Sequence, residues 1–258
     1  MVELRQMSGL RRFVNILKLF GEAKSDWTVQ QISDQLQVPA STVYRSVREL
    51  VATGFLEPSI EGYYRLGASF IEFDRLVRLT DPLVRKGTPF LANIVEQAQV
   101  PCVAVLARLY DNRVMCVADH ASKGSTILTS YERGLPRPLT RGATSKAILA
   151  QLPARRLSKL IENEDWPSRH GMAVTSEEDF RLELTATRKR GYCIGRGEVD
   201  QGLAGIAAPV SVTERAITGS LSLVVRASDM DVATERRLVL LVVSSASLLS
   251  EELRSGTQ

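Results

Sequence analysis

The hydrophobic and polar positions of residues 28–56 repeat at helical spacing and predict two short helices separated by a tight turn. The first helix is expected from Val29 to Leu36, with Ile32 between them on the same buried face. Thr28 stands at the N-cap position, where its hydroxyl can accept a hydrogen bond from a backbone N–H of the first turn. The rest of the chain is interpreted around this pair of helices.

The second helix is expected to follow a turn at residues 37–39 and to reach Ala52. Pro39 fits the first turn of a helix because its missing N–H breaks no hydrogen bond there. Gly54 then acts as a stop signal. The apolar stripe of this helix consists of Val43, Val47, Leu50 and Val51.

The polar face of the second helix carries hydrogen-bond donors suited to DNA. Ser41, Thr42, Arg45 and Arg48 project away from the apolar stripe, and Tyr44 lies at its edge. Hydroxyls and guanidiniums can contact phosphates and base edges in a major groove. The same residue types are common on an ordinary solvent-exposed helix, so the helix alone leaves both interpretations open.

The flanking segments complete a winged helix-turn-helix. A helix from Ser8 to about Phe20 precedes the pair, and a β-hairpin with strands at residues 55–58 and 63–66 follows it. In the hairpin, Arg65 is expected near backbone phosphates, whereas a tyrosine ring at position 63 or 64 is expected in the small core. The apolar face of the preceding helix would consist of Leu10, Phe13, Val14, Leu17 and Phe20.

The pattern changes after residue 67, and helices and strands alternate over residues 83–258, which is the pattern of a mixed α/β domain. The first helix, Ala68 to Leu79, is expected to connect two domains, and its aromatic face would need the winged domain or a partner chain to cover it. Further helices are expected at residues 83–97, 145–152, 155–161, 177–190 and 231–253, and strands at residues 102–109, 113–119, 206–212 and 217–225, with a turn at residues 110–112. The predicted fold class is α+β, with a winged helix-turn-helix at residues 1–66, a linker helix at residues 67–82 and an α/β domain at residues 83–258.

Composition narrows the class of protein without deciding its function. The apolar content of 44% and the charged content of 24% are typical of a soluble globular protein. No apolar run approaches the roughly 18 residues of a membrane span, and the amino terminus lacks the core of a signal peptide, so we expect a cytoplasmic protein that is not bound to a membrane. The three cysteines suit a reducing compartment and give no zinc-binding spacing.

The net charge of +4 permits nucleic-acid binding but is a weak argument for it. Residues 1–66 carry eight Lys/Arg against seven Asp/Glu, a net charge of +1, and the remainder carries 25 against 22, a net charge of +3. A DNA-binding hypothesis therefore depends on where the arginines lie. The nearly neutral winged domain leaves open an alternative in which it binds another protein.

Four motifs make nearly the whole chain similar to the IclR family of bacterial transcription regulators. They are GLRRFVNILKLF, VPASTVYRSVRELVATGFLEP followed by YYRLG, GLPRPLTRGATSKAILAQL, and RKRGYCIGRGEVDQGLAGIAAPV. The resemblance implies a GAF-like effector-binding domain, double-stranded operator DNA as a partner, and a homodimer or a dimer of dimers. It also implies a ligand-controlled repressor or activator of a catabolic operon, and of these two we expect a repressor. The predicted DNA contacts are Thr28, Ser41, Thr42, Tyr44, Arg45, Arg48 and Arg65.

A loop of small residues at positions 140–146 suggests where an effector binds. It runs into a helix, so free N–H groups gather at the positive end of a helix dipole, where an organic carboxylate would be stabilised. Gly142 and Ala143 would let the ligand approach the backbone, and Thr144 adds a hydroxyl. Without the resemblance, a plainer alternative is favoured, in which Thr144 and Ser145 only cap a helix and Gly142 forms a turn.

The resemblance extends the effector pocket to three further stretches, which fall on Gly195, on Gly205, and on Ser220 and Ser222. Relatives place a carboxylate and a thiol near the first two positions. Glycines there suggest a roomier pocket with fewer side-chain donors. We therefore expect a bulkier acid, aromatic or cyclic, in place of a small keto acid.

An enzyme in the second domain is the remaining alternative. The chain has two histidines, His120 and His170, and it shows no metal-ligand spacing, nucleophile elbow or phosphate loop. His120 follows Asp119, but neighbours in a strand point to opposite faces, which weakens a catalytic pair. We therefore expect no catalytic residues, no metal and no cofactor, and control of DNA binding by a population shift between two arrangements.

Overall fold

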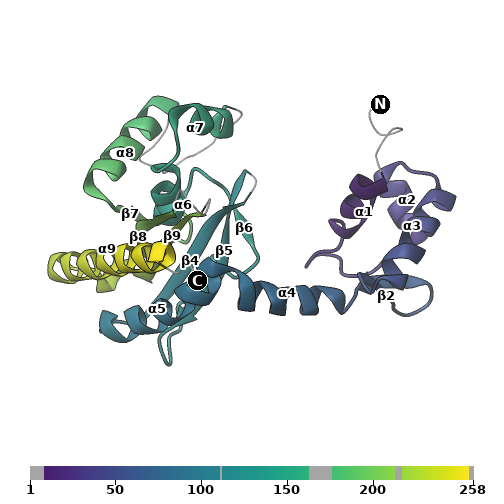
Figure 1. The fold of residues 1–258 in the computed structure, drawn as a ribbon, viewed down its shortest axis with the longest axis horizontal. Helices are drawn as coiled ribbons and strands as arrows, with labels where there is room; N and C mark the ends of the chain where they lie inside the picture. The colour runs from purple at the N-terminus through teal and green to yellow at the C-terminus, as the bar shows by residue number, and fades with distance from the viewer. Residues whose placement is uncertain (1–8, 111, 163–175, 213–216, 256–258) are drawn as a thin grey trace. The chain divides into compact units, whose positions relative to one another are not determined.

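The computed structural model describes residues 9–110, 112–162, 176–212 and 217–255 and divides the chain into two compact units, at residues 1–79 and 80–258 (Figure 1). The predicted helix start at Ser8, the turn residue Asp111 and His170 lie outside the described residues.

The first unit is the expected winged helix-turn-helix. Its elements are α1 (Gly9–Leu17), β1 (Trp27–Thr28), α2 (Val29–Leu36), α3 (Ala40–Ala52), β2 (Leu56–Pro58) and β3 (Tyr63–Leu66). The three strands form an antiparallel sheet in the order β1-β3-β2. Both central helices have the predicted bounds except that Pro39 is the N-cap of α3 and not a residue of its first turn.

The first helix differs from its prediction. It ends at Leu17, so Phe20 packs on the core from the segment that follows. Ile16 is fully buried, whereas Leu10 is 73% exposed and Val14 is also exposed, which corrects the predicted apolar face. The small core instead joins Ile16 to Ile32 of α2 and Val47 of α3.

A further helix, α4 (Ser69–Thr80), is attached to the end of α3. The Ser69 hydroxyl donates to the Thr53 carbonyl (2.9 Å), and the Ser69 N–H donates to the Gly54 carbonyl (3.1 Å). The Phe55 ring contacts Phe70 edge-on and stacks on Phe73, with centroid distances of 5.4 and 5.7 Å. The winged unit therefore covers part of the aromatic face of α4, although both phenylalanines on that helix stay partly exposed.

The second unit is built on one six-stranded antiparallel sheet in the order β6-β5-β4-β9-β8-β7. Its strands are β4 (Cys102–Tyr110), β5 (Arg113–Ala121), β6 (Pro136–Arg137), β7 (Cys193–Arg196), β8 (Leu203–Val212) and β9 (Ile217–Arg226). Its helices are α5 (Pro82–Ala98), α6 (Gly142–Leu149), α7 (Ala154–Ile161), α8 (Glu177–Arg190), the short 3-10 helix η3 (Ala227–Asp229) and α9 (Val232–Ser255). The four predicted strands are present, and the short strands β6 and β7 were not predicted.

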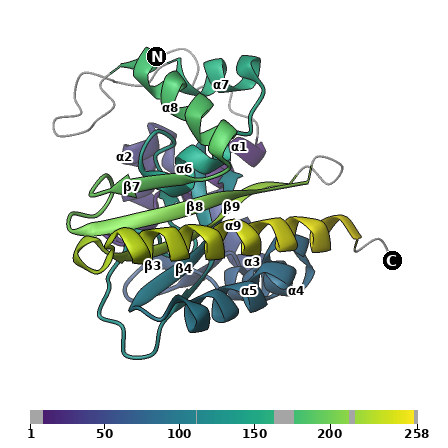
Figure 2. The ribbon, with the colours of Figure 1, turned by 90° about the vertical axis from the view of Figure 1, so that its left-hand side faces the viewer.

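Two hydrophobic cores lie on opposite faces of this sheet. On one face α5 and α9 pack side by side against the strands, with Leu91, Leu106 and Leu238 fully buried between them (Figure 2). On the other face α6, α7 and α8 enclose a second core around Phe180 and Ile148. The central helix of that face, α6, packs between the sheet and α8. These contacts hold the first turn of α6 inside the domain. Among the described residues, no helix is long and apolar enough to cross a membrane.

Candidate functional site

The first turn of α6 is the centre of the predicted effector site, and the structure corrects its geometry. The helix begins at Gly142, not at Ser145, so Thr144 and Ser145 are internal helical residues and Arg141 is the N-cap. All eight residues from Gly142 to Leu149 are buried. Gly142 has a φ of +79°, a left-handed conformation that only glycine adopts without strain.

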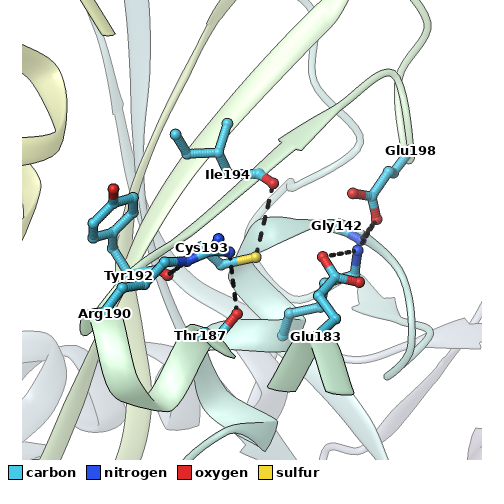
Figure 3. A network of polar contacts seen from close by, with 9 residues as sticks. Gly142, Glu183, Thr187, Arg190, Tyr192, Cys193, Ile194 and Glu198 are labelled. Carbon is cyan, nitrogen blue, oxygen red and sulfur yellow. Dashed lines mark hydrogen bonds and ion pairs between the residues drawn. The ribbon is translucent and has the colours of Figure 1, made fainter. Parts of the chain in front are cut away.

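The N–H groups expected to be free at this helix start already have one internal partner. The Gly142 N–H donates to Glu198 Oε2 at 3.1 Å, and Glu198 comes from the turn between β7 and β8 (Figure 3). A side-chain carboxylate thus lies where a ligand carboxylate was predicted. The positive end of the helix dipole therefore binds a carboxylate, but this carboxylate comes from the protein itself.

Lys146 is the charged residue around which the site is built. Its side chain is almost fully buried, and its Nζ lies 2.8 Å from Glu198 Oε2 and 2.8 Å from Glu183 Oε1 of α8. Burial alone would lower the pKa of Lys146, but the two carboxylates outweigh it and raise the pKa above its ordinary value. The ammonium is therefore charged, and it holds α6, α8 and the β7–β8 turn together.

A pocket opens beside this ion-pair network; we call it the glycine pocket. Its empty space of about 340 Å³ includes open solvent at the mouth. Its lining residues are Thr129, Tyr131, Gly142, Ala143, Thr144, Gly195, Gly197, Glu198, Val199, Asp200, Leu203, Ala204, Gly205 and Val224. Five of the seven predicted effector residues, namely Gly142, Ala143, Thr144, Gly195 and Gly205, are in this lining.

The two glycines that suggested a roomy pocket differ in what surrounds them. A Cβ atom at Gly205 would meet only the Ala143 methyl at 3.7 Å, so that side of the pocket has space. A Cβ atom at Gly195 would lie 2.9 Å from Glu198 Oε1, because the Glu198 carboxylate fills that space. The extra room is therefore on the Gly205 side.

The two predicted serines on β9 lie behind the pocket and do not line it. Both are fully buried. The Ser220 hydroxyl donates to the Thr144 carbonyl (3.1 Å), and the Ser222 hydroxyl lies 3.0 Å from Thr144 Oγ1. They hold Thr144 and the first turn of α6 in place.

The polar residues of the pocket other than Thr144 were not predicted from the sequence. Tyr131 and Asp200 line it, and Lys146 and Glu183 lie next to it. Asp200 accepts hydrogen bonds from the Thr129 hydroxyl and the Ser130 N–H, which fixes the loop before β6 to the β7–β8 turn. A lysine inside the small, apolar stretch of α6 was the only available signal, since buried lysines require a partner.

The predicted DNA-contacting face lies on the solvent side of α3. Ser41, Arg45 and Arg48 are exposed, and Tyr44 is 50% exposed. The opposite side is fixed by Val43 and Val47 in the core and by the Arg12 guanidinium, which donates to the Ser46 hydroxyl (2.9 Å). Donors therefore project from a helix that is anchored along its other face.

Two other predicted DNA residues have partners within the unit. The Thr28 hydroxyl accepts from the Gln31 N–H (3.2 Å), and the Gln31 side chain accepts from the Thr28 N–H (3.2 Å), which completes a capping box for α2. Arg65 on β3 forms an exposed ion pair with Glu57 on β2 (2.7 Å). Phosphate contact by Arg65 would have to compete with Glu57.

The groups considered for catalysis do not come together in the part of the chain that the structure describes. Asp119 and His120 are exposed neighbours on β5. No cluster of three or more His, Cys, Asp or Glu side chains with metal-binding geometry occurs among the described residues.

Comparisons with known proteins cover both units. The family model for the IclR helix-turn-helix domain matches residues 9–59, and the model for the bacterial transcriptional regulator IclR C-terminal domain matches residues 81–251. The glycerol operon regulatory protein of Streptomyces griseus is 26% identical over 255 residues, which cover 98% of each chain.

Two solved structures have a similar fold. An IclR transcriptional regulator from a Silicibacter species superposes with a TM-score of 0.82 at 18% identity, over 95% of this chain and 96% of that chain. An IclR homolog from Microbacterium hydrocarbonoxydans, complexed with 4-hydroxybenzoate, superposes with a TM-score of 0.78 at 22% identity, over 96% of this chain and 100% of that chain.

Proposed function

Because the chain belongs to the IclR family of bacterial transcriptional regulators, with a helix-turn-helix and a carboxy-terminal effector-binding domain, we propose that it represses a catabolic operon under the control of a small organic acid. The anchored α3 with its exposed donor face is the observation that supports DNA binding most directly. The regulator acts on chromosomal DNA, which makes the cytoplasm its proposed location.

We assign base and phosphate contacts to α3, which acts as the recognition helix. Arg45 and Arg48 are the proposed principal contacts, with Ser41, Thr42 and Tyr44 beside them. Thr28 and Arg65 are proposed as flanking phosphate contacts. The partner is double-stranded operator DNA, bound by a homodimer, or by a dimer of dimers, with recognition helices about one duplex turn apart or more.

The DNA-binding proposal is tested with operator sites selected from a random DNA pool by the full-length protein. Arg45→Ala should weaken binding and relax base preference at one position, at a cost of about 1 to 3 kcal/mol. Arg75→Ala, which removes the same charge from an exposed position on α4, is the matched control. A uniform loss with a salt slope reduced by about 1 would assign Arg45 to a phosphate instead.

The effector proposal rests on the glycine pocket and on the room beside Gly205. We propose an aromatic or cyclic acid, in place of a keto acid of two or three carbons, because Gly205 leaves that side of the pocket without a side chain. The Microbacterium homolog in complex with 4-hydroxybenzoate is a precedent for this class of ligand in the same fold. The effector would shift the population between two arrangements of the dimer, and typical couplings of about 1 to 3 kcal/mol change operator occupancy by roughly 5- to 150-fold.

The effector proposal is tested by calorimetry with aromatic acids, glyoxylate and pyruvate, followed by operator binding with each ligand. Tight binding of glyoxylate or pyruvate, with the aromatic acids inert, would contradict it. The same samples address the alternatives: an enzyme would convert the bound acid, and we propose that it is recovered unchanged. A winged domain that serves only for protein interaction would select no DNA site.

A further inference from the structure

A second pocket adjoins the glycine pocket and has a different chemical character. Its empty space of about 280 Å³ includes open solvent, and it is lined by Tyr131, Arg137, Pro138, Arg141, Glu198 and Val199. We call it the arginine pocket. Tyr131, Glu198 and Val199 line both pockets, so the two pockets are immediate neighbours.

One buried donor beside the arginine pocket lacks an acceptor. Arg137 Nε is shielded from solvent and has no hydrogen-bond partner. The Tyr131 hydroxyl, which lines the same pocket, is buried and interacts with the hydroxyls of Thr144 and Ser145. Leaving a buried donor unpaired costs about 1 to 3 kcal/mol, so Arg137 indicates a missing acceptor in this pocket.

The local charge balance gives this acceptor its sign. Among the residues that line the arginine pocket, Arg137 and Arg141 carry positive charges and Glu198 carries one negative charge; Glu198 also pairs with Lys146, as does Glu183. Both carboxylates pair with Lys146, and neither guanidinium has an ion-pair partner among the described residues. Asp200 lines only the glycine pocket and is held by Thr129 and Ser130. One unit of positive charge therefore remains for a ligand.

We propose that the arginine pocket is the carboxylate subsite of the effector, where Arg137 and Arg141 pair with the anion and the Tyr131 hydroxyl donates to it. The apolar body of the acid then occupies the glycine pocket, against Ala143 and Leu203. Glu198 keeps its place on Lys146 and on the first turn of α6. The inference rests on the proposed effector function and names the subsite that selects an acid.

The charge state of the tyrosine agrees with this role. Burial raises the pKa of Tyr131 to about 12, so its hydroxyl stays protonated at neutral pH and can act as a donor. The subsite also explains how an anion enters although Glu198 blocks the helix terminus. The anion does not need to displace a carboxylate that already has two partners.

The test compares benzoate with benzamide, its uncharged isostere, by calorimetry on the full-length protein. Benzoate should bind at least about 10-fold more tightly, because a charge-assisted hydrogen bond is worth about 1.5 to 3 kcal/mol. Arg137→Gln and Arg141→Gln should each remove most of this preference, because they weaken benzoate binding much more than benzamide binding. Tyr131→Phe should weaken benzoate binding by a smaller factor. Arg155 is exposed on α7 and lines neither pocket, so Arg155→Gln should not change the affinity for either ligand.

Equal affinities for acid and amide in the wild type would overturn the subsite, as would a preference for the acid that survives in both arginine variants. Absence of benzoate binding would also count against it. Thermal unfolding of each variant separates loss of the subsite from loss of the fold. Operator binding distinguishes failure of the subsite from failure of the proposed function. If an acid releases operator DNA from the arginine variants as well as from the wild type, the proposed function stands and only the subsite is rejected.

Discussion

Lys146 shows how one residue can serve both the core and the site. A buried ammonium is tolerated only because two carboxylates pair with it, and one of them also closes the first turn of α6. This pairing could not be predicted from the sequence, because Glu183 and Glu198 are 37 and 52 positions away, as their residue numbers show. Local spacing carries no information about such partners.

Replacing Lys146 by Met should lower the free energy of unfolding by about 3 kcal/mol, since it leaves two partly buried carboxylates without their cation. Chemical denaturation measures the loss. Lys159→Met, at an exposed position on α7, is the control and should change stability by less than about 0.5 kcal/mol. Equal stability of both variants would mean that the network contributes nothing to the fold.

The three cysteines are buried and free, so their thiols should be unreactive in the native protein. Burial raises the pKa of Cys102 to about 11 and that of Cys116 to about 12, and it also raises the pKa of Cys193. A thiol reagent at pH 8 should therefore label the protein slowly when it is folded and quickly, at three sites, in guanidinium. Fast labelling of one thiol in the native state would contradict this.

The raised pKa values of these thiols predict that the folded protein loses stability at alkaline pH. Their pKa values are higher in the folded state than the ordinary value of 9.0, so their contribution is present below pH 9 and is lost as the pH rises toward 12. In this window, each thiol lowers the free energy of unfolding by up to about 1.4 kcal/mol per pH unit. Denaturation between pH 8 and 10.5 measures the slope, which should be shallower in Cys116→Val. An unchanged slope would exclude Cys116 as a contributor.

At the scale of elements, the amphipathic helices and the longer strands were predictable from their periodicity. The bounds of α2 and α8 match the prediction, because each has a side-chain cap at its start and a left-handed residue at its end. The strands β1 and β6 have two residues each and thus no period to detect. The start of α6 was missed because Gly142 enters the helix from a left-handed conformation.

The capping box of α2 gives a prediction for one element. Thr28→Ala should lower the stability of the winged unit by about 1 kcal/mol, because the Gln31 N–H loses its acceptor. Thr28→Ser retains the hydroxyl and should restore most of the loss. Thermal unfolding measures both variants. If serine and alanine destabilise equally, the methyl group of Thr28 matters more than its cap.

At the scale of the whole molecule, the two units have separate hydrophobic cores. Ile32→Ala should lower the free energy of unfolding of the winged unit by about 2 to 5 kcal/mol. In calorimetry it should shift only one of two unfolding transitions. Benzoate should shift the other transition. A single transition that moves with both changes would show that the units unfold together.

The attachment of α4 to the end of α3 makes this helix a lever for the DNA-binding unit. Serine hydrogen bonds and the Phe55 ring fix its near end, and only Asp81 separates its far end from α5. Its 12 residues are about 18 Å long, so a swing of about 10° at Asp81 would carry the near end through roughly 3 Å. That distance is comparable to the length of a hydrogen bond to a base edge. In the proposed population shift, a small change of direction at one residue would then be enough to move the recognition helix, with the shape of the winged unit unchanged.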